Sequence, residues 1–200
     1  MPGTTSAGAP VALAHDYLLV MRGAERTFHA MADVWPEAPI YTLLYDEQGT
    51  GERFAGREIS TSVMQRLGVG QSTFRRYLPL YPTAIRRMKV REHELLVSSS
   101  SAFAHGLRAA PGAGHICYVH SPFRYAWHEV PVALGEVPAP ARPVLSLALR
   151  RHRRFDRRAV AGLTGLIANS RITQQRIKQF WGRDAPIVHP PVDVRRFRRP

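Results

Sequence analysis

The sequence predicts a doubly wound α/β fold, with one mainly parallel sheet and helices on both faces. Short apolar runs, typical of buried parallel strands, recur along the chain and are separated by segments with helical periodicity. Proline or glycine ends most of these runs abruptly, as Pro122 does after residues 116–119. A chain of 200 residues, 44% of them hydrophobic, is long enough to form one well-packed domain.

The first part of the chain predicts a βαβ unit. Residues 11–14 form an apolar run typical of a buried strand, and apolar residues then recur at helical spacing up to about Trp35. Pro36 and Pro39 end this helix, and residues 40–45 predict the next strand. A strand, a helix and a strand in this order form a right-handed crossover between parallel strands.

The rest of the chain continues this alternation, although residues 46–71 mix turn signals with short pieces and give no clear prediction. A basic helical region over residues 72–88 is broken or kinked by Pro79 and Pro82. The next predicted elements are a strand over 94–97 that runs into serines 98–101, a short helix over 102–108 and a strand over 116–119. A proline-rich loop over 131–143, a basic helix over 144–160 and a strand over 165–169 follow. The last two predicted elements are a helix from an N-cap at Ser170 to Trp181, with Gly182 as its C-cap, and a strand over 187–188.

Cysteine content and hydropathy indicate a soluble or peripheral protein of a reducing compartment. Cys117 is the only cysteine, so no disulfide forms within the chain, and its place in a predicted strand indicates a buried thiol rather than a nucleophile. The small, uncharged amino end does not resemble a signal peptide, and no run approaches the roughly 18 apolar residues of a membrane span. We expect the protein in the cytoplasm, either free or on the inner face of the membrane.

The formal net charge of +13 comes almost entirely from arginine and gathers at residues 75–91, 150–158 and 195–199. Such a field attracts nucleic acid, anionic lipid or phosphorylated ligands. No zinc-finger spacing or RNA-binding aromatic motif accompanies it, so nucleic acid is not the expected partner. Residues 74–91 interleave arginines with aromatic and aliphatic residues, which fits either docking on an anionic membrane or a solvated helix face with a buried apolar side.

His120 is the main candidate for a functional residue because it follows the predicted strand 116–119. In an open parallel sheet, ligands bind in the crevice outside the carboxyl ends of the strands. Arg124, Tyr125 and Trp127 follow closely. Arginine pairs with phosphate groups and aromatic faces stack on sugars, so we expect Arg124 and Tyr125 to line a substrate pocket, whereas packing against the sheet is the preferred interpretation of Trp127.

Two other strand ends carry candidate substrate-binding residues. His15 and Asp16 end the first strand, although Asp16 is equally suited to holding a loop by hydrogen bonds. Ser99 lies in the serine run 98–101, which either binds substrate or begins the next helix. No metal site is expected, because alternation along the strand places His115 and His120 on opposite faces of the sheet.

Several of these segments together resemble the amino-terminal domain of family-four retaining glycosyltransferases, the GT-B group that includes bacterial mannosyl- and glucosyltransferases. The matching segments are HDY at 15–17, RGAE at 22–25, IYTL at 40–43, RYLPL at 76–80, LVSSS at 96–100, CYVHSPFRYAW at 117–127, ANSR at 168–171 and VHPPVD at 188–193. Each motif is weak alone, but their shared order and spacing cover nearly the whole chain.

This resemblance implies a Rossmann-like acceptor-binding domain that faces a second domain, which holds a nucleotide-sugar donor. We therefore expect a flexible tail over residues 1–9, the acceptor domain over 10–190 and the start of an interdomain linker over 191–200, with the donor domain absent and the chain alone inactive. The expected partners are the nucleotide sugar as co-substrate, a glycan or lipid-linked acceptor and the donor domain, without a metal or other cofactor.

The resemblance also assigns roles to two residues. His120 matches the histidine near the transferred sugar, where an imidazole either donates a hydrogen bond to a hydroxyl or stabilises charge. Gly23 matches a glycine whose missing side chain lets a donor diphosphate or sugar approach backbone amides, although Ala24 replaces the second glycine of many relatives and a plain turn glycine is an alternative. A non-catalytic module that binds an anionic glycolipid or membrane surface is the alternative function.

Overall fold

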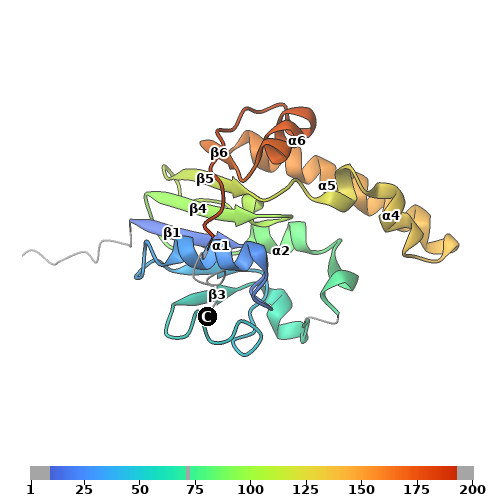
Figure 1. Cartoon of the computed structure of the whole chain (residues 1–200). Helices are drawn as coiled ribbons and strands as arrows, with labels where there is room; N and C mark the ends of the chain where they lie inside the picture. Colours follow the sequence, from blue (N-terminus) through green and yellow to red (C-terminus); the bar gives the residue numbers. More distant parts are fainter. Residues whose placement is uncertain (1–9, 71–72, 193–200) are drawn as a thin grey trace, which may run out of the picture.

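The computed structural model describes residues 10–70 and 73–192, without the side chains of residues 75 and 76. The predicted tail over residues 1–9 and most of the predicted linker over 191–200 lie outside the described residues. Within the described part, one sheet forms the centre and helices pack on both of its faces (Figure 1).

Six strands form a single sheet in which every pair of neighbours is parallel. Their order is β3-β2-β1-β4-β5-β6, so the chain builds one half outward from β1, then returns to add β4 on its other side. The strands are β1 (Val11–His15), β2 (Ile40–Thr42), β3 (Ile59–Thr61), β4 (Leu95–Ser100), β5 (Gly114–Val119) and β6 (Gly165–Ala168). This topology confirms the predicted doubly wound α/β class, with its switch point between β1 and β4.

Helices cover the two faces of the sheet according to the two-residue alternation of side chains. Ala12 and Ala14 of β1 belong to the apolar cluster that includes residues of α2 and α5, whereas Leu13 packs with α1 on the opposite face. The α-helices are α1 (Gly23–Ala32), α2 (Tyr81–Arg87), α3 (Arg124–Trp127), α4 (Val130–Gly135), α5 (Arg142–Ala161) and α6 (Arg171–Trp181). The short 3₁₀ helices are η1 (Val63–Leu67), η2 (Phe74–Tyr77), η3 (Ala104–Gly106) and η4 (Ala139–Ala141).

The helix after β6 has the predicted ends, because its sequence contains both capping residues. The Ser170 hydroxyl accepts a hydrogen bond from the Thr173 amide at 3.3 Å, and Gly182 adopts a left-handed conformation with φ of 68°. These are the N-cap and C-cap geometries that serine and glycine favour. α5 is also close to its prediction, with bounds of Arg142–Ala161 against the predicted 144–160.

Three predicted elements differ from the structure. The predicted loop over 131–143 is largely helical, because Pro131 and Pro143 lie in the first turns of α4 and α5, where a helix loses no internal hydrogen bond to proline. The predicted helix over 102–108 shortens to η3. The predicted strand 187–188 is only an isolated bridge from Ile187 to Ala168, between two prolines that donate no backbone hydrogen bond.

Strand lengths also differ from the predictions. β4 extends through Ser100, because its buried serine hydroxyls all find hydrogen-bond partners, and the serine run is therefore part of the strand. The predicted strand 40–45 stops at Thr42, and pairing resumes only as an isolated bridge between Leu18 and Tyr45. The edge strand β3 was not predicted. None of the helices among the described residues is long and apolar enough to cross a membrane.

Candidate functional site

The carboxyl ends of β1, β4 and β5 bring together three polar side chains on the sheet face that α1 covers. Ser99 Oγ lies 3.1 Å from His15 Nδ1 and 2.8 Å from His120 Nε2. His15 and Ser99 are paired residues in the β1–β4 register, and His120 follows the last residue of β5. His15 and Ser99 are fully buried, whereas His120 is only partly buried. The three residues form a hydrogen-bonded line from the interior to the edge of the sheet.

The two imidazoles of this line are neutral near physiological pH. Burial lowers the pKa of His15 to about 4, against opposing effects of Asp16 and Ser99. Burial also lowers the pKa of His120 to about 4, with a further lowering from His15. A hydroxyl has a single proton, so Ser99 donates to one imidazole and accepts from the other. Because His120 Nε2 is engaged by Ser99, Nδ1 is the ring nitrogen that remains for a ligand.

Asp16 lies at the same edge but its carboxylate is occupied by the loop after β4. Oδ1 accepts hydrogen bonds from the amides of Phe103 and Ala104, and Oδ2 accepts from the amide of Ala102 at 3.0 Å. The Ser101 amide and the Ser100 hydroxyl also donate to it, and the residue is only 3% exposed. This geometry fits the loop-fixing alternative for Asp16, while its contact with substrate stays a prediction.

A second polar network, which sequence reasoning missed, continues from Asp16 on the opposite face of the sheet. Ser100 Oγ lies 3.0 Å from His105 Nδ1, and His105 Nε2 lies 3.2 Å from Asp156 Oδ1 in α5. Asp156 also lies 2.9 Å from His152 Nε2 and accepts a hydrogen bond of 2.6 Å from the Trp127 indole. Asp156 has no exposed surface.

The histidines around Asp156 keep its carboxyl group ionised. Burial alone would raise the pKa of the Asp156 carboxyl, but His152 and His105 lower it more strongly, so its net pKa lies well below the ordinary value. The sequence contains one signal for this site. Asp156 is the only acidic residue between positions 137 and 183, and it lies four residues after His152, on the same side of a helix otherwise rich in arginine.

Gly23 is the first residue of α1 and is exposed. A Cβ atom placed on it would meet no atom within 4 Å, and its φ is not positive. Neither packing nor backbone conformation therefore requires glycine at this position. The alternative of a turn that needs glycine is not supported by this geometry, and the donor contact stays a prediction.

Arg124 and Tyr125 contact each other in the short helix α3. The Arg124 guanidinium lies 4.7 Å from the centre of the Tyr125 ring and donates a hydrogen bond of 3.0 Å to its hydroxyl. Arg124 is exposed and also pairs with Glu129 at 3.4 Å. Trp127 stacks on Phe180 of α6 with ring centres 5.1 Å apart and donates a hydrogen bond to Asp156 of α5, so it has a packing role, but against helices rather than against the sheet as predicted.

The remaining titratable residues of β5 are buried for structural reasons. His115 lies on the opposite face from His120, since it bonds Ser98 at 2.8 Å whereas His120 bonds the next residue, Ser99. Cys117 has no exposed surface, and burial raises the pKa of its thiol to about 12, which confirms the buried-thiol interpretation. Among the described residues, no group of three or more His, Cys, Asp or Glu side chains is arranged to hold a metal ion.

Comparison with protein families decides the assignment. The model of Glycosyltransferase Family 4 matches residues 21–196. The chain belongs to glycosyltransferase family 4. No match was found among curated proteins or among solved structures. The match and the parallel sheet together confirm the predicted amino-terminal, Rossmann-like domain of a GT-B glycosyltransferase.

Membership of glycosyltransferase family 4 gives the polar line at the strand ends its chemical context. The family transfers glycosyl groups. His15 and Ser99 lie at the carboxyl ends of β1 and β4, which form the switch point where open α/β sheets bind ligands, and His120 follows the neighbouring strand β5. Two cavities of the structure lie elsewhere, between α2, the segment after η3 and α5, and neither is lined by these three residues.

Proposed function

We propose that this domain forms the acceptor-binding half of a retaining glycosyltransferase. In the complete enzyme, a hexosyl group such as mannose would pass from a nucleotide sugar to a glycan or a lipid-linked acceptor. The observation that carries the proposal is the position of His120, a partly exposed imidazole beside the switch point, hydrogen-bonded to Ser99 of β4. Family membership supports glycosyl transfer in general.

In this proposal His120 contacts the transferred sugar through Nδ1. Its Nε2 is hydrogen-bonded to Ser99, which is bonded to His15, so the ring orientation is fixed before substrate arrives. A fixed, neutral imidazole favours transfer, because a hydrogen bond to a sugar hydroxyl is formed without a cost in reorganisation. The open edge around His120 is consistent with a cleft whose opposite wall is the donor-binding domain.

The other predicted contacts complete the proposed cleft. Gly23 lies at the start of α1, after the loop that follows β1, where backbone amides are suited to the donor diphosphate. Arg124 and Tyr125 present a guanidinium and an aromatic ring just after His120, as an acceptor with phosphate and sugar groups would require. We further propose that the enzyme works in the cytoplasm, at the inner face of a bacterial membrane, where lipid-linked acceptors are available.

Substitution of His120 tests this function. In an enzyme that joins this domain to its donor-binding half, we expect His120→Ala to lower the transfer rate by about two to three orders of magnitude, as loss of one transition-state hydrogen bond does elsewhere. The matched control is His29→Ala, because His29 lies on α1 and contacts Asp33, the Arg53 carbonyl and the Phe54 ring, none of which belongs to the polar line. Near-normal turnover of the His120 variant would contradict the assignment. A product with inverted anomeric configuration by NMR would contradict retention.

A further inference from the structure

The connection between β4 and β5 leaves a groove on the sheet face opposite His120. The only helix in this connection is the three-residue η3, and irregular chain over residues 107–113, with a turn at Pro111 and Gly112, then leads to β5. A helix of several turns in the β4–β5 connection would occupy the space between α2 and α5. Instead, a cavity of about 410 Å³ lies there, and an adjoining cavity of about 500 Å³ shares four of its lining residues.

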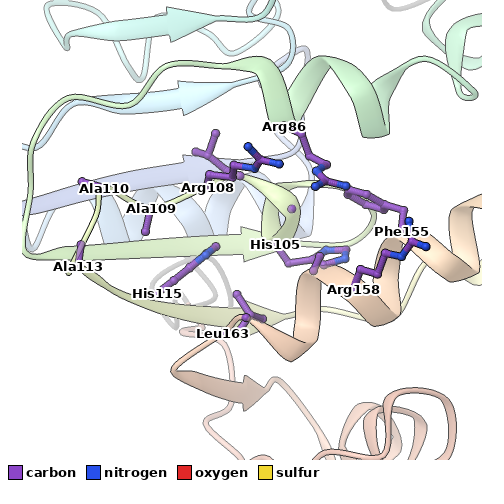
Figure 2. Close-up of a pocket in the computed structure, with 14 residues that line it drawn as sticks. Arg86, His105, Arg108, Ala109, Ala110, Ala113, His115, Phe155, Arg158 and Leu163 are labelled. Atoms are coloured by element: carbon purple, nitrogen blue, oxygen red, sulfur yellow. The ribbon is translucent and has the colours of Figure 1, made fainter.

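Arginine side chains dominate this groove, which we call the arginine groove. They extend from α2, from the segment after η3 and from α5, and Figure 2 shows Arg86, Arg108 and Arg158 reaching the first cavity from these three segments. Six of the nine residues that line the adjoining cavity are arginines: Arg86, Arg87, Arg108, Arg151, Arg154 and Arg158. No aspartate or glutamate lines either cavity.

These six guanidinium groups have no partner among the described residues. All six residues are exposed, and none makes a hydrogen bond or an ion pair with another part of the described chain. Some exposed arginines elsewhere in the protein are paired, as Arg91 is with Glu58 at 2.8 Å and Arg124 with Glu129. Six like charges around one groove repel each other, so an anion that enters would remove an unfavourable interaction as well as form new bonds.

Size and charge specify the ligand class. The two cavities have the volume of small-molecule sites, which run from roughly 300 to 1,000 Å³. Guanidinium groups bind phosphate oxygens through paired N–H donors, and a single monovalent anion would engage only a small part of six arginines. Phe155 and Leu107 give the first cavity an apolar wall, so the groove also accommodates an uncharged part of the ligand.

We propose that the arginine groove binds a ligand that carries two or more phosphate groups, at a site separate from His15, Ser99 and His120. The proposal stands independently of the proposed glycosyl transfer, because the groove lies on the α2–α5 face and the polar line lies on the α1 face. A soluble polyphosphorylated molecule and a phosphorylated lipid headgroup share this chemistry.

Calorimetric titration with inorganic tripolyphosphate at constant ionic strength tests the proposal. We compare the chain with the double variant Arg86→Gln/Arg158→Gln and with the matched control Arg53→Gln/Arg66→Gln. The control removes the same charge from exposed arginines whose guanidinium groups also lack a partner among the described residues, but which lie outside both cavities. We expect saturable binding that weakens at least tenfold in the groove variant and less than twofold in the control. Equal weakening in both variants would show a general charge effect and overturn the proposal.

A second arm distinguishes the source of the phosphate groups. Vesicles of phosphatidylcholine with a phosphatidylinositol bisphosphate are compared with phosphatidylcholine alone, using the same two double variants. Groove-dependent binding to the bisphosphate vesicles, without affinity for tripolyphosphate, would support a lipid headgroup as the ligand. Absence of binding in both arms would overturn the proposal. If single-stranded RNA displaces tripolyphosphate and binds more than tenfold more tightly, the groove is a nucleic-acid site and the proposal is overturned.

Discussion

Ser99 is the residue on which the polar line depends, because its one hydroxyl contacts two imidazoles. Ser99→Ala would leave a ring nitrogen of His15 and one of His120 without that partner in a buried position. We expect the free energy of unfolding to fall by about 1–3 kcal/mol, the usual cost of an unsatisfied buried polar group. Glycosyl transfer in the complete enzyme should fall with it, since His120 loses its fixed orientation.

The neighbouring serine supplies the control for this prediction. Ser98 is equally buried on β4, but its hydroxyl bonds His115 on the opposite face of the sheet. Ser98→Ala should therefore destabilise the protein by a similar amount in urea unfolding and leave transfer within about twofold of the wild type, if transfer is measured well below the melting temperature. Equal loss of transfer in the two variants would show that Ser99 acts through stability alone.

The buried histidines also predict how stability depends on pH. Burial lowers the pKa of His15 and His120 to about 4 and that of His115 to about 3, from an ordinary value of 6.5. Between about pH 6.5 and 4 the unfolded chain therefore binds more protons than the folded one, so stability is complete above this window and falls as the pH is lowered through it. Each histidine contributes up to about 1.4 kcal/mol per pH unit.

Urea unfolding at a series of pH values from 7.5 to 4.5 measures this dependence. His115→Gln should reduce the slope of stability against pH by up to one proton, because it removes one buried imidazole outside the polar line. A stability profile that is flat over the window would contradict the neutral, buried state of these rings.

At the scale of elements, Gly106 determines how closely α5 approaches the sheet. A Cβ atom on Gly106 would overlap the Phe155 ring of α5. We expect Gly106→Ala to lower the free energy of unfolding by about 1–3 kcal/mol, since an added methyl group in a packed region forces neighbours to move. Gly135→Ala is the control, because a Cβ there meets no atom within 4 Å. Recovery of stability in Gly106→Ala/Phe155→Leu would establish the clash as the cause.

The elements that sequence patterns predicted well are those whose two ends are marked by capping residues. The helix Arg171–Trp181 has a serine cap and a glycine cap, and its bounds agree with the prediction. By contrast, Ile59–Thr61 is a three-residue edge strand whose residues are only partly buried, so it carries no distinct apolar pattern. Serine is seldom fully buried, so the serines of β4 carry no strand signal of their own. Only the partners on neighbouring strands, which lie far away in sequence, explain their burial.

The whole molecule explains why only part of the site was predictable. The sequence indicated that His15, Ser99 and His120 each lie near the end of a strand, but strand order is a property of the complete sheet. Because β4 pairs with both β1 and β5, the three ends become neighbours and the hydrogen bonds form. The network around Asp156 was missed for the same reason, since its members come from η3, α3 and α5 and only their packing brings them together.

This buried network connects distant parts of the fold, so Asp156→Ala should destabilise the molecule far more than a surface substitution. The change leaves the Trp127 indole and two histidines buried without their carboxylate, and each buried polar group left without a partner costs about 1–3 kcal/mol. Asp184→Ala is the control, because Asp184 pairs with Lys178 at the surface and such pairs contribute about 0–1 kcal/mol. Urea unfolding measures both variants, and Asp156→Asn, which keeps the shape of the side chain, should show an intermediate loss of stability.

Amide exchange in residues 101–104 should also accelerate in Asp156→Ala, since Ser100 links His105 to the Asp16 carboxylate that holds this loop. Equal stability of the Asp156 and Asp184 variants would mean that the network is not a structural link.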